Sequence, residues 1–117
     1  MCQVNQTCQV GNNIYTGNGD DYVHVSKAEG FAGLLGLYEV NINGNKQLMT
    51  AEQLEKAQFH LGDGNDVLVV DSNVTVGVHA DGGRGDDVLV GGRGNDDLRG
   101  GDGNDAIFGR GGNDELQ

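Results

Sequence analysis

An all-β fold of short, stacked parallel strands is expected from three features of this chain. The last 36 residues, from position 82 to 117, are four nonapeptides in register: GGRGDDVLV, GGRGNDDLR, GGDGNDAIF and GRGGNDELQ. Each nonapeptide has an aspartate at its sixth position and an aliphatic residue at its eighth. The chain of 117 residues contains 22 glycines and no proline, a composition that suits tight turns better than an ordinary two-layer core.

The N-terminal part, residues 1–25, is expected to contain degenerate strands and one repeat. TGNGDDYVH (16–24) places Asp21 and Val23 at the sixth and eighth positions. The preceding NNIYT has the form of a decayed repeat, with Asn12 in place of the aspartate. Cys2 and Cys8 are the only cysteines, and a disulfide, weak metal binding and free thiols remain open for them.

Residues 26–60 do not repeat and are predicted to form a hairpin followed by a short helix. In LYEVNINGNKQLM, Asn43-Gly44 is a strong signal for a two-residue hairpin turn. Thr50 and Gln53 have the spacing of a capping box, and Ala51, Leu54 and Ala57 fall on one helix face. We expect this insertion to cap or flank the strands. Binding of a partner is the alternative role for it.

Residues 61–117 are predicted to form the main repeat region. LGDGNDVLV (61–69) supplies Asp66, which precedes Asp87 by 21 residues, three more than two periods. A bulge or a wider turn is therefore expected between them. Val74, Val76 and Val78 alternate with small or polar residues, which predicts a strand. Thr75 falls at the sixth position there and lacks a carboxylate, so a metal site at that point should be missing or weak.

The period itself predicts how the repeats stack. Positions seven to nine form a strand of three residues, and the glycine-rich residues before them form a turn. Two such units make a coil of 18 residues, which stacks Leu89 on Ile107 and Leu98 on Leu116. The sixth-position aspartates then stack as well. Two carboxylates about 5 Å apart repel by roughly 3 kcal/mol at an effective dielectric constant near 20, and a cation between them reverses the sign.

The donor atoms in these turns indicate which cation would bind. Carboxylates and main-chain carbonyls are hard oxygen ligands in an irregular cage, which calcium accepts more readily than magnesium or zinc does. His24, His60 and His79 do not recur with the turns and are expected to be ordinary strand or surface residues. No stretch has the spacing of an EF-hand loop.

The runs GGRGDDVLV, GGRGNDDLR and GGDGNDAIF resemble the calcium-binding nonapeptides of the RTX (repeats-in-toxin) family. The resemblance covers residues 82–117 and 61–69 well, 16–24 less closely and 26–60 not at all. It implies a right-handed parallel β-roll that binds several Ca²⁺ ions between neighbouring turns. It also implies a secreted bacterial protein that stays unfolded in calcium-poor cytoplasm and folds outside the cell.

The same resemblance implies a set of ligands. The side-chain ligands would be Asp66, Asp87, Asp96, Asp105 and Asp114, with Asp21 the weakest match. Main-chain carbonyls at the second and fourth positions would add Gly83, Gly85, Gly92, Gly94, Gly101, Gly103, Arg110 and Gly112. The fifth-position residues Asp86, Asn95, Asn104 and Asn113 are expected to stabilise the turns, and Arg110, which interrupts a double glycine, to loosen the last one.

Charge and motif content restrict the function further. A formal net charge of −11 argues against binding to nucleic acid and to anionic membranes. No segment is apolar enough to span a bilayer, the N-terminus lacks the pattern of a signal peptide, and no catalytic motif is present. We therefore expect a non-enzymatic calcium-binding module of a larger exoprotein, toxin or effector, with any catalytic domain outside this chain.

Other functions have less support from the residues. The main alternative is an adhesive or ligand-binding roll of a surface protein. An ice-binding version would need a regular outward ladder, and the third positions Arg84, Arg93, Asp102 and Gly111 form none. An enzyme site hidden in residues 26–60 and an inert acidic linker are the remaining hypotheses. A linker has no reason to keep an aliphatic residue two positions after every aspartate.

Overall fold

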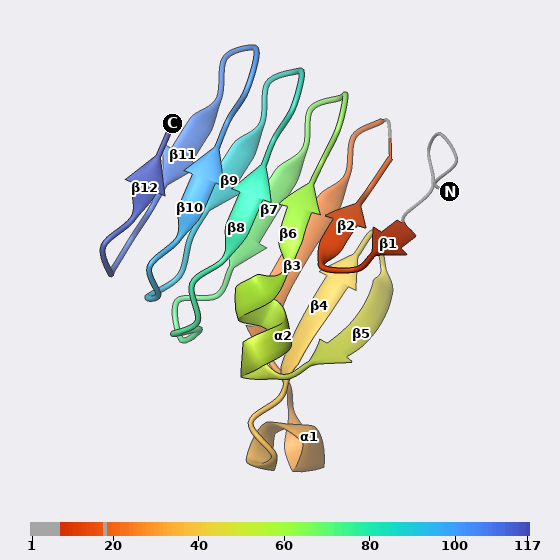
Figure 1. Cartoon of the computed structure of the whole chain (residues 1–117), viewed down its shortest axis with the longest axis vertical. Coiled ribbons are helices and arrows are strands. Elements are labelled where there is room, and N and C mark those ends of the chain that lie inside the picture. Colours follow the sequence, from red (N-terminus) through yellow and green to blue (C-terminus); the bar gives the residue numbers. More distant parts are fainter. Residues whose placement is uncertain (1–7, 18) are drawn as a thin grey trace.

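In the computed structural model, which describes residues 8–17 and 19–117, two six-stranded sheets form the body of the molecule (Figure 1). The first sheet has the strand order β1 (Cys8–Val10), β2 (Asn13–Tyr15), β6 (Gln58–His60), β8 (His79–Asp81), β10 (Asp97–Arg99) and β12 (Glu115–Leu116). The second has the order β11 (Ala106–Phe108), β9 (Val88–Val90), β7 (Val67–Val70), β3 (Tyr22–Lys27), β4 (Tyr38–Ile42) and β5 (Asn45–Met49).

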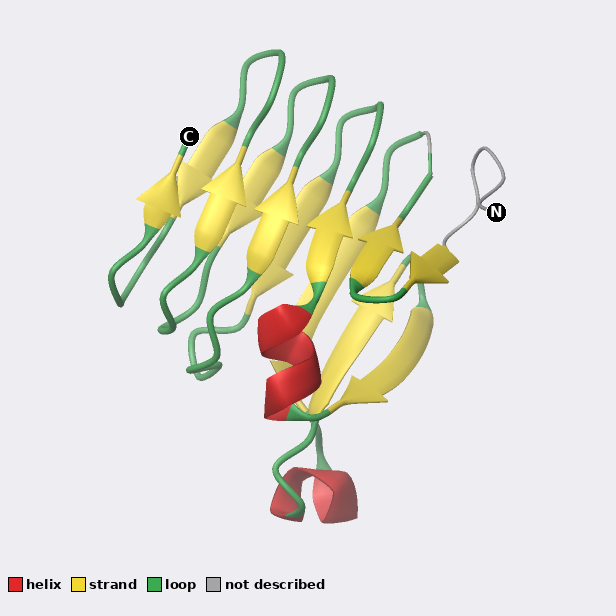
Figure 2. Ribbon diagram, in the orientation of Figure 1, coloured by secondary structure: helices red, strands yellow, loops and turns green. Residues whose placement is uncertain are grey.

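Two short helices accompany the sheets (Figure 2). Helix α1 (Gly30–Leu34) lies between β3 and β4, projects away from the sheets and buries none of its residues. Helix α2 (Ala51–Lys56) follows β5 and begins with the predicted capping box, in which Thr50 and Gln53 hydrogen-bond reciprocally. None of the described helices is long and apolar enough to cross a membrane.

The predicted pairing of the repeats is confirmed. Strand β9 pairs with β11 in parallel and places Leu89 opposite Ile107, while β10 pairs with β12 and places Leu98 opposite Leu116. The decayed repeat near the N-terminus joins the same arrangement, since Ile14 of β2 lies opposite Phe59 of β6. Leu89 and Leu98, at the eighth position, are 0% exposed and lie in the core, whereas Leu116, on the last strand of its sheet, is 45% exposed.

The predicted fold class, an all-β right-handed parallel β-roll, is wrong. Both sheets contain antiparallel pairs, β1 with β2 in the first and β3 with β4 and β4 with β5 in the second. With the two helices, the fold is an α/β-like arrangement of two sheets that each contain parallel and antiparallel pairs. The departure comes mainly from the residues that do not repeat: Asn43 and Gly44 both have positive φ, which turns β4 back on β5 as a hairpin.

The segment between β7 and β8 also differs from its prediction. Val74, Val76 and Val78 form no strand; Val74 and Val78 are buried and Val76 packs against the core within a turn. The three additional residues lie before Val78, so Val78 and not Thr75 occupies the sixth position, as the hydrogen bond from Asp97 N–H to the Val78 carbonyl shows. Neither residue carries a carboxylate.

One hydrophobic core joins the repeats and the insertion. It contains inward residues of both sheets, such as Leu68 and Leu98, together with Tyr38 of β4 and Leu54 of α2. The predicted helix face of Ala51, Leu54 and Ala57 is only partly formed: Ala57 is buried but lies just after the end of α2, and Ala51 is exposed. Strand β6, within the range assigned to the insertion, pairs with β2 and β8. The division into residues 1–25, 26–60 and 61–117 stays a prediction, and Cys2 lies outside the described residues.

Candidate metal centre

The turns before β3, β7, β9 and β11 bring four sixth-position aspartates into one column, which we call the first aspartate column: Asp21, Asp66, Asp87 and Asp105. Each aspartate is joined to the next through its main chain. Oδ1 of Asp66 accepts a 2.8 Å hydrogen bond from Asp21 N–H, and Oδ1 of Asp87 accepts one of 2.8 Å from Asp66 N–H. Oδ1 of Asp105 accepts the same bond from Asp87 N–H. The side chains thus follow one another from repeat to repeat along one edge of the molecule.

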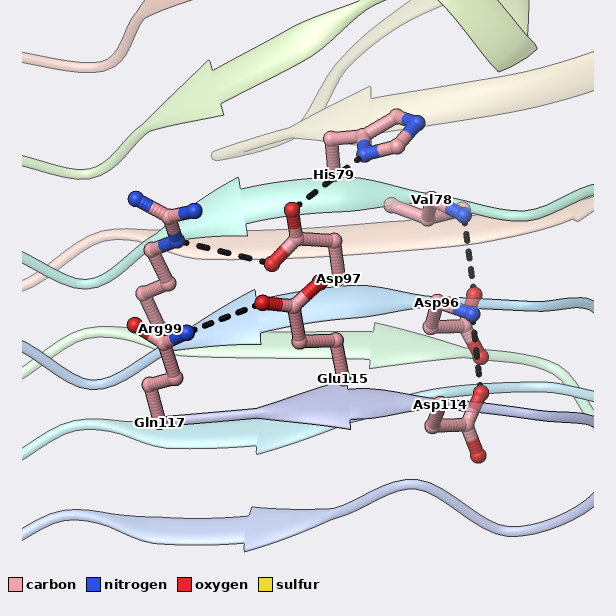
Figure 3. A network of polar contacts seen from close by, with 8 residues as sticks. All are labelled: Val78, His79, Asp96, Asp97, Arg99, Asp114, Glu115 and Gln117. Carbon is pink, nitrogen blue, oxygen red and sulfur yellow. Dashed lines mark hydrogen bonds and ion pairs between the residues drawn. The ribbon is translucent and has the colours of Figure 1, made fainter.

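A second, shorter column lies on the opposite edge, in the turns before β10 and β12 (Figure 3). Oδ1 of Asp96 accepts a 2.8 Å hydrogen bond from Val78 N–H, and Oδ1 of Asp114 accepts one of 2.8 Å from Asp96 N–H. This column starts at an apolar residue, so it contains only two carboxylates. The first column has the greater concentration of negative charge.

In four of these aspartates the other carboxylate oxygen has no hydrogen-bond partner in the protein. Asp66, Asp87 and Asp96 are at most 1% exposed, and Asp21 is 8% exposed. The Oδ2 atoms of all four are buried and accept no hydrogen bond. An unpaired buried carboxylate oxygen is costly, and in a native protein it calls for an ion or a water as partner. These atoms are therefore suited to accept a cation.

The electrostatics of the columns agree with this. The pKa of Asp66 is raised to about 7, mainly by burial, with the main-chain hydrogen bond from Asp21 lowering it and the neighbouring carboxylates of Asp21 and Asp87 raising it. The pKa of Asp87 is raised to about 6, again mainly by burial, and the carboxylate of Asp105 is among the other causes that raise it. For Asp96 the pKa is raised to about 6, again by burial first. Near neutral pH these carboxylates lack a compensating positive charge.

Glycine at the first position leaves room for the carboxylate. A Cβ atom on Gly82 would lie 2.6 Å from Oδ2 of Asp87 and 2.8 Å from the carbonyl oxygen of Gly100. At the second and fourth positions, Gly83 and Gly85 have φ of 78° and 112°, values that a side chain disfavours. The glycines therefore fix both the turn conformation and the position of the aspartate.

The predicted main-chain ligands all lie in these turns. On the edge of the first column, the carbonyl oxygen of Gly83 accepts a 3.0 Å hydrogen bond from Asp102 N–H, and that of Gly85 faces Gly103 in the next repeat. These carbonyls point along the stack, next to the aspartate columns. The predicted carbonyl ligands at the opposite edge are those of Gly92, Gly94, Arg110 and Gly112. The ligand roles of all fourteen residues stay a prediction.

The fifth-position side chains form a ladder beside each column, which agrees with their expected role in the turns. Asp20, Asn65 and Asp86 each accept a 2.8–2.9 Å hydrogen bond through Oδ1 from the fifth-position N–H of the next repeat. Asn95 accepts the equivalent bond from Asn113 N–H at 2.8 Å. A carbonyl oxygen of an amide serves as well as a carboxylate here, which explains why asparagine and aspartate alternate at this position.

Within the described residues, no group of three or more histidine, cysteine, aspartate or glutamate side chains is placed so that it could hold a metal ion. Each repeat contributes one sixth-position carboxylate, so an ion at a column would need main-chain oxygens as well. This requirement matches the expectation of mixed carboxylate and carbonyl ligands for calcium.

The histidines do not enter the columns. His24 Nε2 lies 2.7 Å from Asp71 Oδ1, and the ring of His60 stacks on Tyr15 with centroids 4.8 Å apart. His79 lies beside Asp97 and Arg99 on strands of the first sheet, as Figure 3 shows. One residue that touches the first column was expected only as a turn residue: the side chain of Asn43 hydrogen-bonds to Asp21. The sequence gives no sign of this contact, because 22 residues separate the two.

Comparison with protein families identifies four copies of the RTX calcium-binding nonapeptide repeat, over residues 11–26 and 81–116. The resemblance inferred from the sequence is therefore confirmed for these segments. The first match includes Asp21, and the second includes the sixth-position aspartates of the last four repeats. Comparison with curated proteins and with solved structures gives no match.

Proposed function

Because the chain carries RTX calcium-binding nonapeptide repeats, a non-catalytic calcium-binding module, we propose that its two aspartate columns are the calcium sites. The observation that carries this proposal is the row of buried, unpaired Oδ2 atoms on Asp21, Asp66, Asp87 and Asp96. Calcium accepts six to eight oxygen ligands at flexible geometry, so carboxylates of a column and carbonyls of its turns can serve together.

The bound ions would supply the positive charge that the columns lack. Asp66 would neighbour ions on either side of it, since its carboxylate lies between Asp21 and Asp87. Asp105 and Asp114, the last aspartates of the first and second columns, are only partly buried and would hold their ions less firmly. Several ions are expected, more of them on the first column than on the second.

We further propose that the chain folds when calcium binds. Without the ion, three buried carboxylates would have to ionise in the folded state or stay protonated at a pH above the pKa of an unfolded aspartate. The ion affinity would then contribute directly to the free energy of folding. Such coupling suits a module of a secreted bacterial protein, which meets abundant calcium only outside the cell.

A paired substitution tests the site assignment. Asp66→Asn keeps the size of the side chain and removes a buried carboxylate, whereas Asp63→Asn removes an exposed carboxylate from the same turn. We expect Asp66→Asn to lower the calcium stoichiometry or weaken binding roughly tenfold or more, as expected for loss of a charged ligand. Asp63→Asn should leave binding within about twofold.

Isothermal titration calorimetry measures binding, and circular dichroism recorded from chelator to millimolar calcium measures folding. Wild-type protein that binds no calcium, or a folded spectrum in chelator that calcium does not change, would contradict the calcium and the folding proposals respectively. If Asp66→Asn and Asp63→Asn give the same calcium titration, the first aspartate column is not a calcium site.

A further inference from the structure

Asn43 stands at the turn between β4 and β5 and reaches the end of the first aspartate column. Its φ of 53° is left-handed, as a two-residue hairpin turn requires. Its side-chain amide makes two hydrogen bonds to the repeat that begins the column. Nδ2–H donates to Oδ1 of Asp21 over 2.9 Å, and Oδ1 accepts from Tyr22 N–H over 2.8 Å.

The same two hydrogen bonds join the repeats inside the column. Asp21 N–H donates to Oδ1 of Asp66, and the Asp21 carbonyl accepts from Val67 N–H over 2.9 Å. In the next repeat of the column, Asp66 N–H donates to Oδ1 of Asp87, and the Asp66 carbonyl accepts from Val88 N–H. Each interior aspartate therefore accepts a hydrogen bond from the N–H of the preceding aspartate in the column, and the residue that follows it donates its N–H to the carbonyl of that same preceding aspartate.

Asp21 is the first member of the column and has no preceding sixth-position aspartate beneath it. The amide of Asn43 offers one donor and one acceptor at that place, and these contact the equivalent atoms, Oδ1 of residue six and N–H of residue seven. A side chain of the insertion therefore stands in for the main chain of a preceding repeat. The hydrogen bond from Asn43 N–H to the Tyr22 carbonyl, 2.9 Å long, anchors the turn against the same repeat.

We propose that Asn43 caps the first aspartate column and holds Asp21 in the orientation in which its unpaired Oδ2 receives calcium. This rests on the calcium sites proposed above and goes beyond them, because it makes the non-repeating insertion part of the N-terminal site. Asn43 acts as a positioning residue: its oxygen is engaged with Tyr22 N–H, and its nitrogen meets the carboxylate. Of the acyclic side chains of this length, only an amide supplies both a donor and an acceptor.

Two substitutions separate this role from the ordinary preference of such turns for asparagine. Asn43→Gly keeps the left-handed turn without strain and deletes the amide. Asn43→Asp keeps the shape and the acceptor, but replaces the donor by a carboxylate next to Asp21. The matched control is Asn41→Asp, which adds the same charge to the same turn. Asn41 only accepts a 2.8 Å hydrogen bond from Gly44 N–H, and an aspartate can do this equally well.

Calcium titration of the full chain by calorimetry decides between the outcomes. We expect Asn43→Asp to lose one calcium or to weaken one class of sites roughly tenfold, and Asn43→Gly to weaken it roughly threefold, the low end of the range for one hydrogen bond, because this turn faces solvent. Asn41→Asp should stay within about twofold of wild type. If Asn43→Asp also impairs folding, adding Asp21→Asn should restore folding in saturating calcium, because the amide at position 21 can donate to the carboxylate at position 43, but it should not restore the lost ion.

The cap is overturned if Asn43→Gly and Asn43→Asp both titrate like Asn41→Asp, or if Asn43→Asp binds calcium more tightly than wild type by becoming a ligand itself. Asp87→Asn, in the middle of the column, is measured in parallel. If the wild type binds no calcium, the proposed function fails. If wild type and Asp87→Asn differ but the Asn43 variants do not, only the cap fails. Should Asn43→Asp not fold at saturating calcium, Asn43→Gly alone decides.

Discussion

Each sixth-position aspartate in the interior of the first column uses its two carboxylate oxygens differently. Oδ1 accepts an N–H from the preceding repeat and thereby sets the register of one strand-turn unit on the next, as between Asp66 and Asp87. Oδ2 is buried without a partner. An amide in this place could keep the first role but would give up the negative charge of the second. This division explains why the sixth position is always aspartate in the last four repeats, while the fifth is aspartate in one of them and asparagine in three.

Arg110 is the residue at which the period and the turn geometry disagree. It occupies the second position of the repeat with a φ of 60°, close to the 80° of Gly101. The turn therefore keeps the glycine-type conformation, and the backbone of Arg110 is strained. We expect Arg110→Gly to stabilise the folded protein by about 0.5–1 kcal/mol, because relief of left-handed strain of about 1–3 kcal/mol exceeds the entropy that glycine adds to the unfolded chain.

Denaturant unfolding in saturating calcium measures this change, with Arg93→Gly as the control. Arg93 is an exposed residue of the preceding turn on the same edge and does not have a positive φ. Glycine there relieves nothing and should destabilise slightly. A free energy of unfolding that falls for Arg110→Gly as much as for Arg93→Gly would show that the left-handed backbone at position 110 stores no strain.

At the scale of elements, the two helices of the insertion have opposite relations to the core. Helix α2 places Leu54 in it with 0% exposure. Helix α1 lies in a loop whose two ends are joined by the 3.0 Å hydrogen bond from Ala28 N–H to the Leu37 carbonyl. The side chains of Phe31, Leu34 and Leu35 in this loop are 61–85% exposed. Of the two helices, therefore, only α2 packs against the core of the strands.

Truncation of one leucine in each helix tests this difference. Leu54→Ala should lower the free energy of unfolding by about 2–5 kcal/mol, the range for a buried leucine replaced by alanine. Leu34→Ala, at 85% exposure, should change it by less than about 0.5 kcal/mol. Both are read from denaturant unfolding at saturating calcium. A loss of more than about 1 kcal/mol for Leu34→Ala would mean that α1 packs against something in solution.

The parts of this fold that could be predicted are those in which one residue type has one role at a fixed spacing. Leu89 lies opposite Ile107 as the 18-residue spacing required, and Asn43-Gly44 formed its hairpin. The three additional residues before Val78 could not be placed, since buried valines suit a turn and a strand equally. The contact between Asn43 and Asp21 could not be predicted from the sequence, because it depends on how the hairpin packs against the column and no local sequence pattern encodes that packing.

For the whole molecule, the decisive property is where the negative charge lies. The formal net charge is −11, and three of the aspartates are buried with pKa values raised to about 6 or 7 from an ordinary value of 3.8. In the calcium-free chain, a folded-state pKa above the unfolded one means that the folded protein binds more protons between these values. This extra proton binding by the three buried carboxyls stabilises the folded state. The stabilisation is fully present below about pH 4 and is lost as the pH rises through 6 to 7.

Calcium should reverse this dependence, because protons and calcium compete for the same carboxylates. In chelator, lowering the pH from 8 to 5 should raise the melting temperature of whatever structure is present, or increase the β signal in circular dichroism. In saturating calcium the same change should leave the melting temperature unaltered or lower it. The variant with Asp66, Asp87 and Asp96 all replaced by asparagine should show a much weaker dependence in both conditions, since none of the three carboxyls with a raised pKa remains to take up the proton. A calcium-free wild type that loses structure between pH 8 and 5 would contradict the unpaired, buried state of the column carboxylates. Acid destabilises a folded protein when its carboxylates are stabilised by internal partners, because their pKa is then lowered and not raised.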